Sequence, residues 1–565
     1  MPIRLATPAS RAYAYPLLIR RLLQTAIAVA PAQEIVYRDR VRHTYGTLNE
    51  RVGRLASGLA RLGVEPGTTV AVMDWDSHRY LECFFSVPMM GAVLMTVNVR
   101  LTPAQIAYTL NDAGAEVLLL HRDFIPIFEA FRGQVRSLRK VVLIEDGAAA
   151  EAATPWAAAE FEQLVAESSP DYAFEDFDEN ALATTFYTTG TTGDPKGVCF
   201  SHRQLVLHTL ALLCACASPA YGQSFRHGDV YLPLTPMFHV HAWGFPYVAT
   251  MLGVKQVYPG RWTAADILSL RAREQVTFSH CVPTVLQLLL AEAQAIDANP
   301  QGWKICIGGS VLTPGLARAA LARGVDVFAA YGMSETAPVL TMTRLQQAPT
   351  SPASEREVET RCRTGLPIPL VELRLVEPGS EVPDASSLAE GELTVRTPWL
   401  TPCYVGKPAA SEDLWRDGYL HTQDVARIDA QGYLQITDRL KDVIKTGGEW
   451  VSSIDLENLI SRHPDVLEVA VVAVSDVVWG ERPHVLVVPR PERGKDLTAQ
   501  EVRDFVVTAV ADGVLPRFAV PERITFVERL EKTSVGKINK RALRDQYGTD
   551  VDRSLAPGPC RPTVR

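Results

Sequence analysis

Short apolar segments with strand character alternate with helical patterns through the first 340 residues, and this alternation restricts the fold more than any other feature. Helices are predicted over 77–91 and from Thr102 onward. Strands are predicted at 68–75, 92–98, 115–121, 230–236, 254–260, 276–283, 304–309 and 325–332. Several are apolar throughout, as in strands buried on both faces of a sheet. The pattern therefore predicts an α/β fold of stacked β-sheets layered with helices.

The chain changes character near residue 438. Residues 438–452, DRLKDVIKTGGEWVS, are dense in charge and glycine. A compact pattern follows, with helices predicted at 454–464 and 497–510 and strands at 466–476, 484–489 and 522–528. This length suits a small α+β domain. We therefore expect a large N-terminal domain (1–438), a small C-terminal domain (439–546) and a disordered tail (547–565), with surface loops at 148–160 and 377–392.

Composition and charge narrow the classes of function. The 565 residues are 47% hydrophobic and 21% charged, as in soluble globular proteins, and this length suggests roughly three to four structural units. The net charge of −8 gives no general polybasic surface for nucleic acid or acidic lipid. An anion-binding site must therefore be local.

Cysteine usage and apolar segments indicate the compartment. The nine cysteines are scattered without a CxxC or Cys/His cluster, which argues against a disulfide scaffold or a zinc site and favours reduced, mostly buried thiols. Arg20 and Arg21 interrupt the apolar run near the N-terminus, and the longest apolar segment, around 211–217, is shorter than the ~20 residues of a membrane span. These features predict a cytoplasmic protein without a transmembrane segment.

Residues 184–202, TTFYTTGTTGDPKGVCFSH, combine an apolar strand with threonines, glycines and Lys196. Glycine lets backbone N–H groups approach a ligand closely, and threonine hydroxyls and the lysine add donors and charge. The stretch predicts a phosphate-binding loop. It fits neither the Walker pattern nor the GxGxxG loop of kinases. An ordinary Gly/Thr turn between two strands is the alternative when this stretch is taken alone.

Four further motifs accompany this loop: YGMSET at 331–336, DGYLHTQDVA at 417–426, the 438–452 stretch and TSVGKINKRAL at 533–543. Together with TTGTTGDPKG at 188–197 they resemble the adenylate-forming superfamily of acyl-CoA synthetases, adenylation domains and luciferases. The resemblance covers residues 30 to 546, with the five motifs in the same order. It implies activation of a carboxylic acid with ATP to acyl-AMP and pyrophosphate, followed by transfer of the acyl group to a thiol such as that of coenzyme A.

The resemblance implies which residues bind the phosphates of ATP and a metal ion. It implies that the Gly/Thr loop holds the β- and γ-phosphates of ATP, through Thr188, Thr189, Gly190, Thr191, Thr192, Gly193 and Lys196. Glu335 matches the acid that ligates Mg²⁺, with Thr188 as a second ligand and Ser334 or Thr336 nearby. The implied catalytic residues are Lys537, Glu335, Thr188 and Lys196.

The resemblance also implies which residues bind the nucleoside of ATP. Asp424 matches the acid that binds the ribose, and the adenine pocket matches Gly308, Gly309, Ser310, Ala330, Tyr331, Gly332 and Ser334. Two departures stand out. Gln423 replaces a glycine of the usual Thr-Gly-Asp pattern, so the local backbone geometry is in question. Ala329 and Ala330 replace a frequent Gln-Gly pair, which matters little if the contacts there are made by backbone carbonyls.

A hinge and a mobile lysine follow from the same resemblance. Lys441 matches the pivot between the domains, and Arg439 matches a contact to the nucleotide. Lys537 is expected at the acyl carboxylate and α-phosphate during adenylation. After domain rotation, residues near the nucleotide and the thiol entrance are expected to be Lys445, Gly447, Gly448, Glu449 and Trp450. When Lys537 is considered without the other motifs, the alternative interpretation is one solvated charge among Lys532, Lys540, Arg541 and Arg544.

Residues 234–247, LTPMFHVHAWGFPY, match the border of the acyl pocket, with His239, Val240, Trp243, Gly244, Phe245 and also Thr336 as candidates. The stretch has bulky apolar side chains and no carboxylate to bind an amino group, which disfavours an amino-acid-activating enzyme. Phe245 and Tyr247 also suit simple core packing. The sequence resembles medium- and long-chain fatty-acyl-CoA synthetases, in which a tryptophan gates the tunnel.

Several alternatives stay open. One is an acyl-AMP ligase that loads a carrier protein, and another is a CoA ligase for a bulky natural-product acid. The non-enzymatic alternative is a catalytically inactive nucleotide-binding relative. Relatives are often homodimers through the large domain. Nucleic acid is not expected as a partner.

Overall fold

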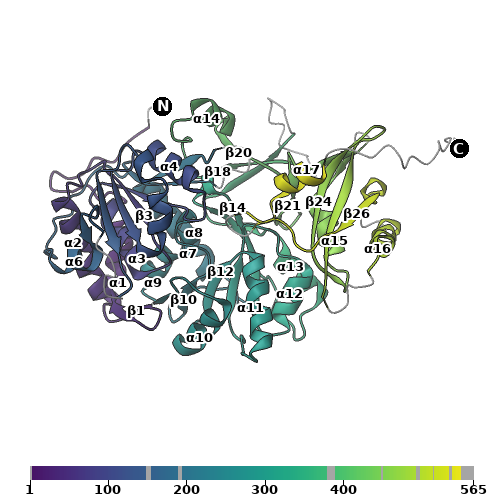
Figure 1. The fold of residues 1–565 in the computed structure, drawn as a ribbon, viewed down its shortest axis with the longest axis horizontal. Helices are drawn as coiled ribbons and strands as arrows, with labels where there is room; N and C mark the ends of the chain where they lie inside the picture. The colour runs from purple at the N-terminus through teal and green to yellow at the C-terminus, as the bar shows by residue number, and fades with distance from the viewer. Residues whose placement is uncertain are drawn as a thin grey trace.

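The described part of the chain forms four β-sheets in the computed structural model (Figure 1). The structure describes residues 3–147, 154–188, 194–377, 389–446, 449–491, 497–512, 515–533 and 537–548. The two largest sheets occupy the left and lower parts of Figure 1, and the C-terminal sheet with β24 and β26 lies at the right. This layered α/β arrangement agrees with the fold class predicted from the sequence.

A seven-stranded sheet has the strand order β7-β6-β5-β3-β4-β8-β9. Its strands are β3 (Thr69–Met73), β4 (Val93–Thr96), β5 (Val117–His121), β6 (Lys140–Ile144), β7 (Ala159–Glu160), β8 (Leu182–Tyr187) and β9 (Gly197–Ser201). Only the β8–β9 pair is antiparallel. The helices among these residues are α2 (Tyr45–Arg61), α3 (His78–Met89), α4 (Pro103–Asp112), α5 (Ile125–Glu129) and α6 (Phe161–Ala166). Thr102 caps α4 by accepting a hydrogen bond from the backbone N–H of Gln105.

A nine-stranded sheet has the order β16-β15-β14-β13-β12-β10-β11-β1-β2. Its strands are β1 (Glu34–Tyr37), β2 (Val41–Thr44), β10 (Val230–Pro233), β11 (Lys255–Tyr258), β12 (Phe278–Cys281), β13 (Lys304–Ile307), β14 (Asp326–Gly332), β15 (Val339–Met342) and β16 (Leu366–Pro367). The helices among these strands include α1 (Arg20–Val29), α7 (His202–Ala217), α9 (Phe245–Leu252), α10 (Ala264–Glu274), α11 (Pro283–Ala295), α12 (Pro314–Leu321) and α13 (Glu355–Cys362). The strands β10 to β14 are parallel, as their apolar sequences predict.

The remaining two sheets follow in sequence. One has the order β17-β18-β20-β19, with β21 paired to β20; its strands are β17 (Glu372–Val376), β18 (Gly391–Arg396), β19 (Trp415–Arg416), β20 (Tyr419–Ile428) and β21 (Leu434–Arg439). α14 (Pro408–Leu414) precedes β19. The C-terminal sheet contains β22 (Ile444–Thr446), β23 (Glu449–Val451), β24 (Val466–Asp476), β25 (Gly480–Pro489) and β26 (Arg523–Phe526). It is accompanied by α15 (Ser453–Ile460), α16 (Ala499–Ala511) and α17 (Lys540–Tyr547).

Each strand and helix predicted above has a counterpart, and the differences lie at boundaries. The predicted loop at 377–392 ends early, because Gly391 and Glu392 already pair with β20 as the start of β18. Asp424 lies inside β20. Residues 148–153, 378–388 and 549–565 lie outside the described residues, so most of the predicted loops and tail are not tested.

The expectations about cysteines and apolar segments can also be compared with the structure. Five of the described cysteines, Cys83, Cys199, Cys216, Cys281 and Cys306, are buried and free, which agrees with the prediction of reduced thiols. Among the described residues, no helix combines the length and the apolar character that crossing a membrane requires.

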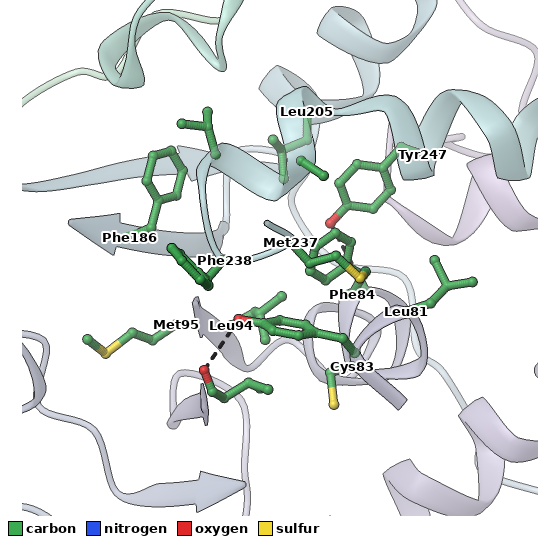
Figure 2. Close-up of a cluster of buried hydrophobic side chains, with 14 of the residues drawn as sticks. Leu81, Cys83, Phe84, Leu94, Met95, Phe186, Leu205, Met237, Phe238 and Tyr247 are labelled. Carbon is green, nitrogen blue, oxygen red and sulfur yellow. Dashed lines mark hydrogen bonds between the residues drawn. The ribbon is translucent and has the colours of Figure 1, made fainter. Parts of the chain in front are cut away.

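An aromatic core joins α3 to the segment that follows β10. Figure 2 shows Phe84 of α3 close to Tyr247 of α9; their ring centroids lie 5.4 Å apart in a stacked arrangement. Phe84 also contacts His241 edge-on at 5.1 Å. Met237 and Phe238, just before His241, belong to the same buried cluster (Figure 2). The predicted acyl segment is thus anchored on a packed core.

Gln423, for which the resemblance implies glycine, has a left-handed backbone with φ of +62°. Glu392 holds it there, since its Oε1 accepts from the backbone N–H (3.2 Å) and from the side-chain Nε2 (3.3 Å) of Gln423. Its carbonyl accepts a hydrogen bond from Leu440 N at 2.9 Å. The conformation that glycine adopts easily is therefore kept, and the glutamine side chain adds a contact to Glu392.

We predict that Gln423→Gly changes the unfolding free energy by less than about 1 kcal/mol. The change relieves about 1–2 kcal/mol of left-handed strain but loses one hydrogen bond and makes the unfolded chain more flexible. Gln423→Val, with a β-branched side chain that fits positive φ poorly, is expected to destabilise the protein by about 2 kcal/mol. Thermal and urea midpoints of both variants test this. A larger loss for glycine than for valine would show that side-chain contacts, not backbone conformation, dominate at this position.

Candidate active site

The residues predicted for adenine lie at the carboxyl ends of β13 and β14, which are parallel neighbours. Ligands of open α/β sheets bind at such strand ends. A Cβ added to Gly308 would lie 3.1 Å from the carbonyl oxygen of Ala330, and one on Gly332 would lie 1.8 Å from that of Pro338. Backbone therefore forms this wall. Alanine at position 330 has the same backbone carbonyl as glycine, so a backbone contact to adenine there stays a prediction.

Glu335 lies in a short 3-10 turn, η3 (Ser334–Thr336), directly after β14. Its side chain is buried, and Tyr404 Oη donates a 2.6 Å hydrogen bond to Oε1. Burial raises the pKa of Glu335, while Tyr404, Arg439 and Lys196 act in the opposite direction. A carboxylate oriented in this way can offer oxygen to a hard cation.

Tyr404 was missed by sequence reasoning, although it connects two predicted residues. Its ring lies beneath Lys196, with Nζ 4.7 Å from the ring centroid, and its hydroxyl holds Glu335. An isolated β-bridge between Val198 and Tyr404 brings this segment to β9. No spacing in the sequence indicates this bridge, so only the fold reveals the contact.

The ends of the predicted phosphate loop are joined. Thr188 N donates to the Lys196 carbonyl (2.9 Å), and Lys196 N donates to Thr188 Oγ1 (3.1 Å). Residues 189–193, which include Thr189, Gly190, Thr191, Thr192 and Gly193, lie outside the described residues. The two ends are thus placed beside Tyr404 and Glu335, and the role of the loop between them stays a prediction.

Asp424 is oriented by two neighbours. Tyr331 Oη donates to Oδ2 at 2.6 Å, and Arg439 Nε lies 3.3 Å from Oδ1. Asp424 and Arg439 are register partners of β20 and β21, so the sheet itself sets this pair. The carboxylate keeps lone pairs for further donors, as binding of a diol requires.

Lys537 reaches from the C-terminal unit to the end of β13. A Cβ on Gly309 would lie 3.1 Å from Lys537 Cε, so the glycine, with φ of +77°, leaves the space that the lysine occupies. Burial first and then the nearby Arg439 lower the pKa of Lys537 to about 8, although Asp424 and Glu335 oppose the shift. The side chain is therefore placed among the predicted catalytic groups.

The other lysines close to Lys537 in sequence form ion pairs with glutamates. Lys532 forms an ion pair with Glu468 at 2.8 Å, and Lys540 forms one with Glu457 at 2.8 Å. Both pairs lie within the C-terminal unit. The alternative of Lys537 as one solvated charge among many does not fit its position beside Gly309.

The segment Val240–Trp243 (α8) and the following Gly244 all have positive φ, between +47° and +77°. Left-handed backbone costs an L-residue roughly 1–2 kcal/mol, so this run is strained. Surrounding bonds hold it: Met237 N donates to Asp76 Oδ1 (2.6 Å), and His241 Nε2 lies 2.9 Å from Thr184 Oγ1. Strain of this kind concentrates at binding sites and switches.

This left-handed turn brings Trp243 to the nucleotide side. The indole is buried, lies 3.0 Å from the position of a Cβ on Gly308, and packs on His280 with centroids 5.1 Å apart. Burial first, and then the charges of Lys537 and Arg100, lower the pKa of the partly buried His239 to about 3. The predicted gate and the predicted catalytic lysine are thus neighbours.

The other residues predicted for the acyl side have structural contacts. Phe245 stacks on His280 at 4.7 Å and packs on Phe278 at 5.3 Å, as the core-packing interpretation expects. A Cβ on Gly244 would lie 3.0 Å from the ring of His208. Thr336 is buried, and its hydroxyl donates to the Met333 carbonyl at 3.1 Å, which closes the turn that carries Glu335.

The hinge residues are not all brought into the cluster. Lys441 follows β21 next to Arg439 and is exposed. Lys445 and Trp450 are cross-strand partners in the β22–β23 hairpin, and both are exposed in this arrangement. Gly447 and Gly448 lie outside the described residues, as does the side chain of Glu449. Ser310 is exposed at the end of β13, and Ser334 is partly buried.

Comparison with known proteins shows which family the chain belongs to. Residues 23–405 match the family described as AMP-binding enzyme, and residues 455–537 match the AMP-binding enzyme C-terminal domain. The long-chain-fatty-acid–CoA ligase of Thermus thermophilus is 40% identical over 537 residues, covering 93% of this chain and 94% of that protein. The medium-chain-fatty-acid–CoA ligase of Ectopseudomonas oleovorans is 34% identical over 547 residues, covering 95% and 97%.

A solved structure shows the same fold. The anthranilate CoA ligase AuaEII in complex with anthranoyl-AMP superposes with a TM-score of 0.81 at 22% identity, covering 94% of this chain and 98% of that one. The family match spans more than half of the chain, and the curated relatives span nearly all of it. The chain therefore belongs to the adenylate-forming family of AMP-binding enzymes, in the branch that includes the fatty-acid–CoA ligases.

Proposed function

We propose that this protein is an ATP-dependent acid:CoA ligase for fatty or other hydrophobic carboxylic acids. In the first half-reaction, the acid and ATP give acyl-AMP and pyrophosphate; in the second, coenzyme A displaces AMP and gives acyl-CoA. One observation carries the proposal: Lys537 is inserted from the C-terminal unit beside Gly309, between the regions of Asp424 and Glu335. A cation brought to a nucleotide site by a separate unit suits the first half-reaction.

The first half-reaction joins two anions, so positive charge must offset their repulsion. Lys537, with a pKa of about 8, is mostly charged at neutral pH and can contact the acyl carboxylate and the α-phosphate. Lys196, at the end of the phosphate loop, can contact the leaving pyrophosphate. Asp424 can accept hydrogen bonds from the ribose hydroxyls, because Tyr331 and Arg439 already fix its orientation.

The residues around Glu335 fit a magnesium ion. A carboxylate and the Thr188 hydroxyl are oxygen donors of the kind that Mg²⁺ prefers together with phosphate oxygens. Bound Mg²⁺ would neutralise charge on the phosphates. Tyr404 holds the carboxylate at 2.6 Å so that it points in one direction before the ion arrives.

The second half-reaction requires Lys537 to leave. We place the boundary between the two domains at residues 438 and 439, with Lys441 as the pivot. Rotation there would withdraw Lys537 and bring the β22–β23 hairpin, with Lys445 and Trp450, towards the thiol entrance. The exposure of both side chains leaves them available for such a contact.

The acyl class rests on the segment from 234 to 247 and on the relatives. Trp243 and Phe245 are buried apolar side chains, and the segment holds no carboxylate for an amino group. The two relatives above are named as fatty-acid–CoA ligases of long and medium chain. A hydrophobic tunnel closed by Trp243 is the arrangement that we propose for this chain.

A panel of carboxylic acids tests the proposal, from acetate to octadecanoate together with aryl and polycyclic acids. We expect CoA thioesters of fatty acids, detected by mass, with AMP release that depends on both the acid and CoA. Accumulation of acyl-AMP that CoA does not consume would favour a ligase that loads a carrier protein. Absence of acid-dependent ATP–pyrophosphate exchange with every acid would contradict catalysis altogether.

We predict that Lys537→Ala loses about 3 kcal/mol or more of transition-state stabilisation in adenylation, which is at least about a hundredfold in rate. Thioester formation from supplied acyl-adenylate should suffer far less, because Lys537 has left by then. Lys532→Ala is the matched control, since its charge is paired with Glu468. An equal loss in both half-reactions would refute the role of Lys537.

We predict that Tyr404→Phe lowers the adenylation rate about 10- to 100-fold at limiting Mg²⁺, because a hydrogen bond to a buried carboxylate contributes about 1.5–3 kcal/mol. Pyrophosphate release measured over a Mg²⁺ titration tests this, and excess Mg²⁺ should restore part of the rate. Tyr433→Phe, which loses a hydroxyl bound to the Arg344 carbonyl, serves as the control. An unchanged Mg²⁺ dependence in Tyr404→Phe would show that the tyrosine does not position Glu335.

A further inference from the structure

Two cysteines that are far apart in sequence lie opposite each other beside the segment that carries Tyr404. An antiparallel β-bridge joins Val198 of β9 to Tyr404. One residue further along this pairing, Cys199 stands opposite Cys403. Residues directly opposite on antiparallel strands have Cα atoms about 4.5–5.5 Å apart and side chains on the same face. This separation falls within the range of about 4.4–6.8 Å that disulfides span between their Cα atoms.

Hydrogen bonds on both sides of the bridge hold the two cysteines in this register. On one side, Val405 N donates to the Gly197 carbonyl at 2.8 Å. On the other side, Thr401 Oγ1 lies 3.1 Å from the carbonyl oxygen of Cys199 and 2.9 Å from that of Cys403. The same Oγ1 accepts a hydrogen bond from Cys199 N at 3.2 Å. Because one hydroxyl lies within hydrogen-bond distance of both carbonyl oxygens, the two backbones are kept close together.

The two free thiols differ in exposure. Cys199 is buried at 8% exposure, whereas Cys403 is partly exposed. Burial first and then the neighbouring Cys403 raise the pKa of the Cys199 thiol to about 11, although Thr401 opposes the shift. Since the thiolate is the nucleophilic form of cysteine, Cys199 is a poor first target for an oxidant. Cys403 is the sulfur that a small molecule from solvent can reach.

We propose that Cys199 and Cys403 form a redox-active pair that a peroxide converts into a reversible disulfide. With hydrogen peroxide, the Cys403 thiolate attacks one oxygen: an S–O bond forms, the O–O bond breaks, and hydroxide leaves and takes up the proton that the thiol released. The product is a sulfenic acid, which condenses with a nearby thiol. The Cys199 sulfur attacks the Cys403 sulfur, an S–S bond forms, the S–O bond breaks, and a second water carries away the Cys199 proton. The two thiols lose two electrons in total, and the peroxide accepts them.

A low-molecular-weight thiol reverses this step by thiol–disulfide exchange. The pair is therefore compatible with a chain whose cysteines are otherwise reduced. The scattered cysteines gave no sign of it in the sequence, because the β-bridge between distant segments brings the two residues together.

The disulfide acts on the residue that follows Cys403. Tyr404 holds Glu335 by a 2.6 Å hydrogen bond, and its ring centroid lies 4.7 Å from Lys196 Nζ. An S–S bond of about 2.05 Å is much shorter than a contact between two free thiols, so the backbone at Cys403 has to move towards β9. We expect this movement to displace Tyr404 from Glu335 and to slow adenylation. That consequence rests on the proposed function, whereas formation of the disulfide does not.

Peptide mapping of the full chain tests the pair directly. The protein is reduced, freed from reductant, exposed to hydrogen peroxide, alkylated to block exchange, digested and analysed by mass spectrometry. We expect two peptides joined through Cys199 and Cys403, lighter by two hydrogen atoms than the separate peptides, and separated again by dithiothreitol. Oxidation of Cys403 to sulfinic or sulfonic acid without this link, or links through other cysteines alone, overturns the proposal.

Cys403→Ser is the decisive variant, because its side chain is only partly buried and the fold should survive the change. Peroxide should slow ATP–pyrophosphate exchange of the wild type at limiting Mg²⁺ by about tenfold, the effect of losing one hydrogen bond to a buried carboxylate, and dithiothreitol should restore it. Cys403→Ser should show neither the link nor the slowing. Cys214→Ser, which removes an exposed cysteine, is the control and should show both.

The two readouts separate this proposal from the proposed function. Equal slowing by peroxide in wild type and Cys403→Ser would refute control of adenylation by the pair. Absence of exchange in the reduced wild type would contradict the proposed function instead, and the peptide map would still decide whether Cys199 and Cys403 form a disulfide.

Discussion

The charged cluster around Lys537 is the interaction on which the proposed chemistry depends. The strand ends of β13 and β14 supply a backbone wall without side chains, and Gly309 leaves room for the lysine. β20 and β21 present Asp424 and Arg439 in register, and the turn after β14 presents Glu335. Two sheets and the C-terminal unit thus converge on one small volume. Each contributes charge that the others partly neutralise, which allows these groups to lie so close together.

A strained turn forms the apolar side of the same volume. Five consecutive left-handed residues, from Val240 to Gly244, would not persist as an isolated peptide, because each L-residue costs roughly 1–2 kcal/mol. The bond of Met237 to Asp76 fixes the segment just before the turn, and the bond of His241 to Thr184 fixes its second residue. As a result Trp243 lies against Gly308, where an acyl chain and a nucleotide would meet.

Much of this could be predicted from the sequence, and the limits have physical causes. Apolar alternation predicted the strands, because burial on both faces leaves a local signature in β3, β5 and β13. The resemblance carried by short motifs singled out Glu335, Asp424 and Lys537, because such motifs are local in sequence. Tyr404 could not be found, because a β-bridge to Val198 between distant segments positions it. The left-handed backbone of Gln423 also depends on tertiary contacts that no local pattern encodes.

The pKa of Lys537 also explains why its insertion can be reversible. Lowering that pKa from 10.5 to about 8 means that, at neutral pH, the docked ammonium costs about 3 kcal/mol relative to water. The cost is fully present below pH 8 and fades as the pH rises towards 10.5, because the neutral amine is then favoured in both places. An acyl carboxylate and a phosphate beside Nζ would cancel it, so the substrates favour the docked arrangement. Once pyrophosphate has left, less negative charge holds the lysine, and withdrawal of the C-terminal unit becomes easier. The same charge that we propose for adenylation would thus weaken its own docking afterwards.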